Sequence, residues 1–366
     1  MRRASVGLCE RLERRTLLSF TFESAFAIGN HGEDKSQAVD VDESGNVYHM
    51  AWFDSGQVDV DPGPGSVNVG VGHEDRGVLG TYLSKVDSAG KFAWGFQLFP
   101  NDAGRTFGAG LSHDAAGNIY ASGSIVKDNI ARIFLSKFSP SGEELWSNIS
   151  SSTKSGFRYF VASDAAGSAF ITGWFDGSLD LDNNGTVDLV GDGAEVDGFV
   201  AKVSSNGSVE WAKSLRGIDN NAFVSPKAIA VDSLGNVLTT GWFDQRVDFD
   251  PGPAEAIAST EHSIATYVLK LDGSGNFKWV RTTESMGTTI DVDAAGNIYT
   301  AGNFDGSVDF DPGPGKRLLT SPPPDQADPG AFISDVYISK LTSSGDLVWA
   351  IRAADSDSIV AGYPRI

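Results

Sequence analysis

Acidic side chains recur in four short loops, in a pattern that is typical of sites for hard cations. Each loop reads Phe-Asp followed by Asp-x-Asp, and the aspartates are Asp54, Asp59 and Asp61; Asp176, Asp180 and Asp182; Asp244, Asp248 and Asp250; Asp305, Asp309 and Asp311. Carboxylates crowded in this way repel one another by roughly 1 kcal/mol per pair in water. A calcium ion would remove that cost, because it prefers carboxylate and carbonyl oxygens. The loops are therefore candidate calcium sites.

One of these loops comes closer than the others to a known calcium-binding pattern. Its oxygen-bearing residues at loop positions 1, 3, 5 and 9 are Asp180, Asp182, Asn184 and Asp188. With Gly185 at position 6, they match most of a DxDxNG loop, in which alternate residues point inward and the glycine permits a sharp bend. Gly191 stands at position 12, where such loops carry a bidentate glutamate. The alternative for all four loops is that the aspartates only form turns and keep the surface soluble.

The loops are inserted into a unit that the chain repeats five times. One anchor of the unit is an Asp-x-x-Gly turn, which begins at Asp42, Asp114, Asp164, Asp232 and Asp293. The other is a lysine at a constant distance before a tryptophan, in the pairs Lys85 and Trp94, Lys137 and Trp146, Lys202 and Trp211, Lys270 and Trp279, and Lys340 and Trp349. Apolar runs of about five residues between such turns predict four short antiparallel strands in each unit.

A single four-stranded sheet of this kind cannot bury both of its faces, whereas copies packed around a ring can do so. We therefore predict an all-β protein, a β-propeller of four-stranded antiparallel blades. The propeller domain is expected to span residues 20–366, with complete repeats at 36–98, 108–150, 159–216, 226–282 and 287–352. One further strand is expected at each end, near Phe22 and near Ile359. These two strands either seal the ring or form a partial sixth blade.

The acidic loops lie between the second and third strands of their units. The second unit passes almost directly from Gly123 to Phe134 without such a loop, so a blade is expected to close in its absence. In the first, fourth and fifth units the Asp-x-Asp runs into Pro-Gly-Pro, which predicts a rigid tight turn. A segment that the scaffold does not need, yet that occurs four times, is a better candidate for function than the scaffold itself.

The units resemble the SBBP repeat family of bacterial β-propellers. The signature of that family pairs an x-G-N-x-Y-x-x-G strand with a later D-x-F-V-A-K-x-x-x-x-G-x-x-x-W stretch. The run from Asp197 to Lys202, together with Trp211, matches the second part closely, and all five units match more loosely over residues 36–352. The resemblance implies the propeller architecture, and it implies no particular activity.

The N-terminal segment, residues 1–19, lies outside the repeat and is expected to be a disordered basic leader. It has no apolar segment of the length that a secretory signal carries. The run from Leu12 to Leu18 resembles the LEPR-XLL motif, with Arg14 where that motif has proline. The motif sits near the N-terminus of many large exported or surface-associated bacterial proteins. The resemblance therefore implies an extracellular or cell-surface location.

Composition and motifs narrow the classes of function. The net charge of −20 disfavours nucleic acid and anionic lipid as partners, and no apolar run is long enough to span a membrane. The five histidines share no position, no motif identifies a nucleophile, and the repeated lysines are expected to be structural. We accordingly predict a monomeric, non-enzymatic scaffold that binds a protein or a glycan through its acidic loops. Trp52, Trp174 and Trp242 lie beside those loops, where they could either stack on a sugar or be buried in a blade.

Two alternatives remain open. The first is a calcium-dependent hydrolase of the lactonase or esterase type, with its metal in the central channel. That enzyme needs inward carboxylates from several units, but Ala162 and Ala230 stand where two other units have Asp40 and Asp291. The second alternative is an inactive fragment of a longer repeat array.

Overall fold

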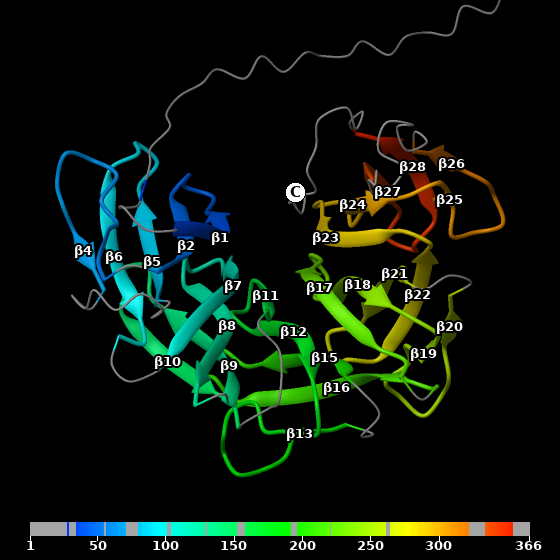
Figure 1. Cartoon of the computed structure of the whole chain (residues 1–366), viewed down its shortest axis with the longest axis horizontal. Coiled ribbons are helices and arrows are strands. Elements are labelled where there is room, and N and C mark those ends of the chain that lie inside the picture. Colours follow the sequence, from blue (N-terminus) through cyan, green and yellow to red (C-terminus); the bar gives the residue numbers. More distant parts are fainter. Residues whose placement is uncertain are drawn as a thin grey trace, which may run out of the picture.

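The computed structural model describes residues 28, 34–54, 56–70, 80–100, 104–128, 130–151, 158–191, 196–219, 221–260, 264–321 and 334–353. These residues form five antiparallel four-stranded blades that stand around a common centre as a β-propeller (Figure 1). The predicted fold class is confirmed. Among the described residues, no helix is long and apolar enough to cross a bilayer. The predicted leader, residues 1–19, and the predicted strands near Phe22 and Ile359 lie outside the described residues.

Each blade runs from an inner strand at the centre of the ring to an outer strand at its periphery. Blade 1 consists of β1 (Asp34–Val41), β2 (Val47–Phe53), β5 (Gly80–Val86) and β6 (Phe92–Leu98). Blade 2 consists of β7 (Arg105–His113), β8 (Ile119–Lys127), β9 (Ile130–Phe138) and β10 (Glu144–Ile149). Blade 3 consists of β11 (Phe160–Ser163), β12 (Ala169–Phe175), β15 (Asp197–Val203) and β16 (Val209–Gly217).

The last two blades follow the same plan. Blade 4 consists of β17 (Val224–Val231), β18 (Val237–Phe243), β21 (Ala265–Leu271) and β22 (Phe277–Thr283). Blade 5 consists of β23 (Met286–Val292), β24 (Ile298–Phe304), β27 (Asp335–Leu341) and β28 (Leu347–Arg352). The inner strands follow one another around the centre in chain order, and no described strand lies between β23 and β1 (Figure 1).

The inner hairpin of each blade is closed by the predicted Asp-x-x-Gly turn. In blade 4, Oδ1 of Asp232 accepts hydrogen bonds from the backbone N–H groups of Leu234 and Asn236 at 3.0 and 2.9 Å. Gly235 adopts a φ of 76°, a left-handed conformation that glycine takes without strain. The turn therefore forms from local chemistry, which is why it was predictable.

Four of the five repeated lysines make ion pairs within their own blades, whereas Lys85 donates to the carbonyl oxygen of Pro140 in blade 2 at 3.2 Å. Lys270 lies 2.9 Å from Oδ2 of Asp232, and both side chains are almost fully buried. The same pairing joins Lys137 to Asp114 at 3.2 Å. These lysines therefore hold the inner hairpin against the third strand, in agreement with the structural role predicted for them.

The repeated tryptophans join consecutive blades. The indole N–H of Trp94 donates to the carbonyl oxygen of Pro140 in blade 2 at 3.1 Å. The ring of Trp94 also covers Gly142, where an added Cβ would lie only 3.0 Å from it. The same stacking recurs for Trp146 on Gly207, Trp211 on Gly275 and Trp279 on Gly345. The outer strands of the first four blades are thereby fixed to the outer turn of the next blade.

The acidic loops form small antiparallel hairpins in four blades. The hairpin strands are β3 (Val58–Asp59) and β4 (Asn68–Val69), β13 (Ser178–Leu179) and β14 (Leu189–Val190), β19 (Arg246–Asp248) and β20 (Ile257–Ser259), and β25 (Ser307–Asp309) and β26 (Leu318–Thr320). Their aspartates alternate with apolar residues that belong to the core, such as Val60 in blade 1 and Phe249 in blade 4. The strand β19 also pairs with β16 of the preceding blade. In these four blades the loops are thus part of the scaffold as well as additions to it.

Candidate metal centre

The loop of blade 3 lies on the hairpin of β13 and β14, and its apolar residues anchor it. Leu179, Leu181 and Leu189 are all buried in the core that blades 2 and 3 share. The aspartates lie between these leucines in the sequence, so anchoring the leucines also fixes the positions of the carboxylates. Asp180 is itself buried, with 6% of its surface exposed.

The three aspartates among the predicted ligands of this loop converge. One carboxylate oxygen from each of Asp180, Asp182 and Asp188 lies within 4.8 Å of the other two. Among the described residues, this is the one group of three or more acidic, histidine or cysteine side chains that meets that criterion. The fourth predicted ligand, Asn184, points its side-chain oxygen at the backbone N–H of Thr186, at 2.8 Å.

Backbone N–H groups of the loop already approach these carboxylates. The two oxygens of Asp180 accept from the N–H of Asn184 at 3.2 Å and from that of Gly185 at 2.8 Å. One oxygen of Asp188 accepts from the N–H of Leu181 at 2.7 Å. Gly185 has a φ of 89°, so the bend needs a residue that tolerates left-handed backbone.

The electrostatics of the loop favour a cation. Burial raises the pKa of Asp188 above its ordinary value, and the charges of Asp182 and Asp180 raise it further. In the part of the chain that the structure describes, no lysine, arginine or histidine forms an ion pair with any of these three carboxylates. The loop therefore holds negative charge at an energetic cost, which a divalent cation would remove.

The three Asp-x-Asp-Pro-Gly-Pro loops share a different geometry. In blade 1, Oδ1 of Asp59 accepts from the backbone N–H groups of Asp61 and Val67 at 3.1 and 2.9 Å, and Asp61 accepts from Gly63 at 2.7 Å. The same bonds occur at Asp248 and Asp250 in blade 4, and at Asp309 and Asp311 in blade 5. These carboxylates hold the turns together. Metal binding by these loops stays a prediction.

The aspartates that directly follow the second strands lie apart from the blade 3 group of three. They are Asp54, Asp176, Asp244 and Asp305. Asp244 accepts from the backbone N–H of Phe223 at 2.8 Å, which ties the start of its loop to the inner strand of blade 4. A metal-binding role for these four residues likewise stays a prediction.

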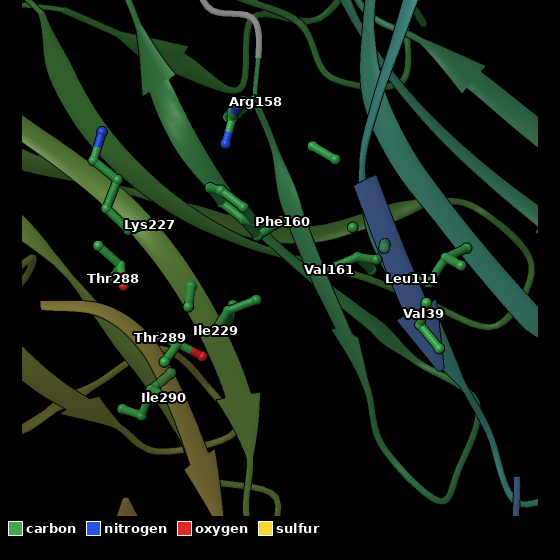
Figure 2. Close-up of a pocket in the computed structure, with 14 residues that line it drawn as sticks. Val39, Leu111, Arg158, Phe160, Val161, Lys227, Ile229, Thr288, Thr289 and Ile290 are labelled. Carbon is green, nitrogen blue, oxygen red and sulfur yellow. The ribbon is translucent and has the colours of Figure 1, made fainter. Parts of the chain in front are cut away.

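A second candidate site, which the sequence analysis missed, is a cavity of about 360 Å³ at the centre of the ring. The inner strands of all five blades line it, and Arg158 and Lys227 stand at one end of it (Figure 2). None of the described residues that line it is acidic. The signal in the sequence was a charged residue just before the apolar run of an inner strand. Arg158 and Lys227 each stand at a position of the repeat where the other units have no charged residue.

Comparison with known proteins supports no function. No protein-family model and no curated protein matches the chain. Among solved structures, a protein of unknown function from Bacteroides caccae shares 12% identity at a TM-score of 0.34, over 74% of this chain and 90% of that one. The polysaccharide lyase Uly1 shares 11% identity at a TM-score of 0.39, over 85% of this chain and 75% of that one.

A third solved structure is BamB from Moraxella catarrhalis, with 13% identity at a TM-score of 0.24, over 72% of this chain and 79% of that one. At these values the three structures carry no argument about activity, partners or location. The class of the protein, a five-bladed β-propeller, is defined by its own strand order.

Proposed function

We propose that this propeller is a non-enzymatic binding scaffold and that the loop of blade 3 binds one calcium ion. The observation that carries the proposal is the convergence of Asp180, Asp182 and Asp188 within 4.8 Å of one another. The DxDxNG pattern would add the side-chain oxygen of Asn184, which in the structure accepts a hydrogen bond from the N–H of Thr186. All four groups are hard oxygen donors, which calcium prefers over nitrogen or sulfur ligands.

The incomplete ligand set fits a weak site. Gly191 supplies no carboxylate at position 12, so water would have to complete a coordination shell of six to eight oxygens. Affinities of roughly 10⁻⁴ to 10⁻³ M are typical of calcium sites in extracellular modules. A site of that strength would be filled outside the cell, which agrees with the location implied by the LEPR-XLL-like segment. That segment lies outside the described residues.

The proposed partner is a protein or a glycan that contacts the acidic hairpins, which four of the five SBBP-like units carry. Calcium would fix the blade 3 hairpin and reduce its negative charge. Partner binding would then cost less conformational entropy and meet less electrostatic repulsion. Trp52, Trp174 and Trp242 are partly buried next to these hairpins. Trp242 donates its indole N–H to the carbonyl oxygen of Gly287 at 2.7 Å, so this ring is held within the scaffold.

The alternative of a channel hydrolase receives less support. Such an enzyme needs carboxylates gathered on the central cavity, and the described residues that line the cavity include none. Asp40 accepts a 2.7 Å hydrogen bond from His113, and Asp291 accepts one from the backbone N–H of Val292. The binding scaffold is therefore the function that the geometry supports best.

Thermal unfolding with calcium or with a chelator tests the proposal. We expect 10 mM calcium to raise the Tm by roughly 2 °C or more, because a ligand at ten times its Kd stabilises by about 1.4 kcal/mol. The response should disappear in the variant Asp180→Ala, Asp182→Ala. It should persist in Asp248→Ala, Asp250→Ala, the matched pair in blade 4. An identical Tm with calcium and chelator would refute the calcium site.

A further inference from the structure

The central cavity has a polarity opposite to that of the rest of the molecule. The chain carries a net charge of −20, yet among the described residues the two charged side chains that line the cavity are the cations Arg158 and Lys227. Thr288 and Thr289 are its other polar side chains. Figure 2 shows the two cations toward one end of the cavity and the aliphatic side chains toward the other.

Lys227 faces the cavity because of an irregularity in its strand. The pairing of β17 with β18 shifts between Pro226 and Ala228, so Lys227 is the extra residue of a β-bulge. A bulge changes the direction of a side chain relative to a regular strand. Equivalent bulges occur in β7 and β23, where the extra residues are Ala109 and Thr288. Both of these residues also line the cavity. The bulge is therefore architectural, whereas the lysine on it is particular to blade 4.

The lysine is held in a defined position. Its Nζ donates to Oγ of Ser225 at 2.9 Å and lies 4.2 Å from the ring centre of Trp242. In the part of the chain that the structure describes, no carboxylate forms an ion pair with it. Burial, and then the neighbouring charge of Arg158, lower the pKa of Lys227 to about 8. An anion placed between these two cations would relieve both effects.

The opposite end of the cavity is lined mainly by aliphatic side chains, with Thr289 among them (Figure 2). One aliphatic residue from each inner strand lines it, at the third position before the turn aspartate: Val39, Leu111, Val161, Ile229 and Ile290. A few fixed polar groups above an apolar lining, in a cavity of this volume, are typical of sites for small organic molecules. The aliphatic ring gives an organic anion a place for its carbon skeleton, which inorganic phosphate lacks.

We propose that the central cavity binds a small organic carboxylate, with its carboxylate between Lys227 and Arg158 and its apolar part against the aliphatic ring. This site is independent of the calcium loop, because the two share no residue. It is also a binding site without a chemical step.

Isothermal titration calorimetry at pH 7 and low ionic strength tests the assignment, with hexanoate as the probe. We expect hexanoate to bind, and 1-hexanol and inorganic phosphate to bind at least about tenfold more weakly. Lys227→Gln and Arg158→Gln should each weaken the binding of hexanoate by more than about tenfold, because each removes a charged hydrogen-bond donor. Lys35→Gln is the matched control, since Lys35 lies over Trp52 at 5.1 Å but does not line the cavity.

A second measurement keeps the test independent of whether the variants fold. The ¹³Cε resonance of Lys227 in the wild-type protein should report a pKa near 8 that rises when hexanoate is added. No response of that resonance to hexanoate, or unchanged affinity in both cavity variants, would overturn the site. Phosphate that binds as tightly as hexanoate would overturn the assignment to an organic anion.

Discussion

Trp211 on the outer strand of blade 3 donates its indole N–H to the carbonyl oxygen of Gly273 in the outer turn of blade 4, at 3.1 Å. The ring of Trp211 also covers Gly275 in that turn. Trp349 occupies the same position in blade 5, and no described blade follows it, so it is 36% exposed. At the other end of the array, Gly90 in the outer turn of blade 1 has no atom of a described residue within 4 Å of where a Cβ would stand.

This contrast predicts unequal effects of the same substitution. Trp211→Ala should reduce the free energy of unfolding by about 2–4 kcal/mol, because it leaves a cavity and an unsatisfied carbonyl group between two blades. Trp349→Ala should cost about 1 kcal/mol or less, because water already reaches that ring. Urea denaturation of the two variants measures the difference, and equal losses would contradict the role of the tryptophan between blades.

The buried pair of Lys270 and Asp232 should be needed for folding stability. Lys270→Met is expected to cost about 3–5 kcal/mol at pH 7, because it leaves a buried carboxylate without its cation. Lys340→Met in blade 5 is the matched control, since the Lys340–Asp293 pair is longer, at 3.7 Å, and more exposed. Chemical denaturation of both variants is the measurement, and the loss at Lys340 should be clearly smaller.

The same pair predicts how stability depends on acid. Burial alone would raise the pKa of Asp232, but hydrogen bonds from Asn236 and Lys270 outweigh it and hold the pKa below its ordinary value of 3.8. A carboxyl group with a lowered pKa stabilises the fold above pH 3.8 and loses that contribution as the pH falls through its folded pKa. The loss of stability caused by Asp232→Asn should therefore be largest at neutral pH and become smaller below pH 4. A deficit that is constant from pH 7 to pH 3 would contradict this assignment.

The contribution of Asp188 to stability should change with pH in the opposite direction. Its pKa is raised by burial and by Asp182 and Asp180, so the folded state binds its proton more tightly than the unfolded state does. Without calcium, the wild type should lose stability as the pH rises from 3.8 through this raised pKa. Asp188→Asn should therefore have the higher Tm at pH 7 in a chelator, the same Tm as the wild type near pH 3, and little response to calcium. Thermal scans across pH in EGTA test the first two expectations.

Asp59 distinguishes turn formation from metal binding in the Asp-Pro-Gly loops. Asp59→Ala removes an acceptor of two backbone hydrogen bonds and should reduce the free energy of unfolding by about 1–2 kcal/mol. If the carboxylate serves the turn alone, that cost is the same in calcium and in a chelator. A cost that is larger in calcium would show that the loop of blade 1 binds the ion as well.

The sequence by itself determined the repeat, the four strands of each blade and the turns between them. These features depend on neighbours within a few residues, such as Asp232 with Asn236 and Gly235, so periodicity and turn chemistry were enough to predict them. The candidate ligands Asp180, Asp182 and Asp188 also lie within one short loop. Their convergence was therefore predictable, although the burial that raises the pKa of Asp188 was not.

The tertiary structure alone decided which residues meet across blades. Trp94, Trp146 and Trp211 reach turns that lie 46, 59 and 62 residues away. Arg158 and Lys227 come together because the inner strands of different blades meet at one centre. The acidic loops were predicted as dispensable additions, but Phe249 and its counterparts pack into the core. A local pattern cannot contain such contacts, because they depend on how the ring places one repeat against the next.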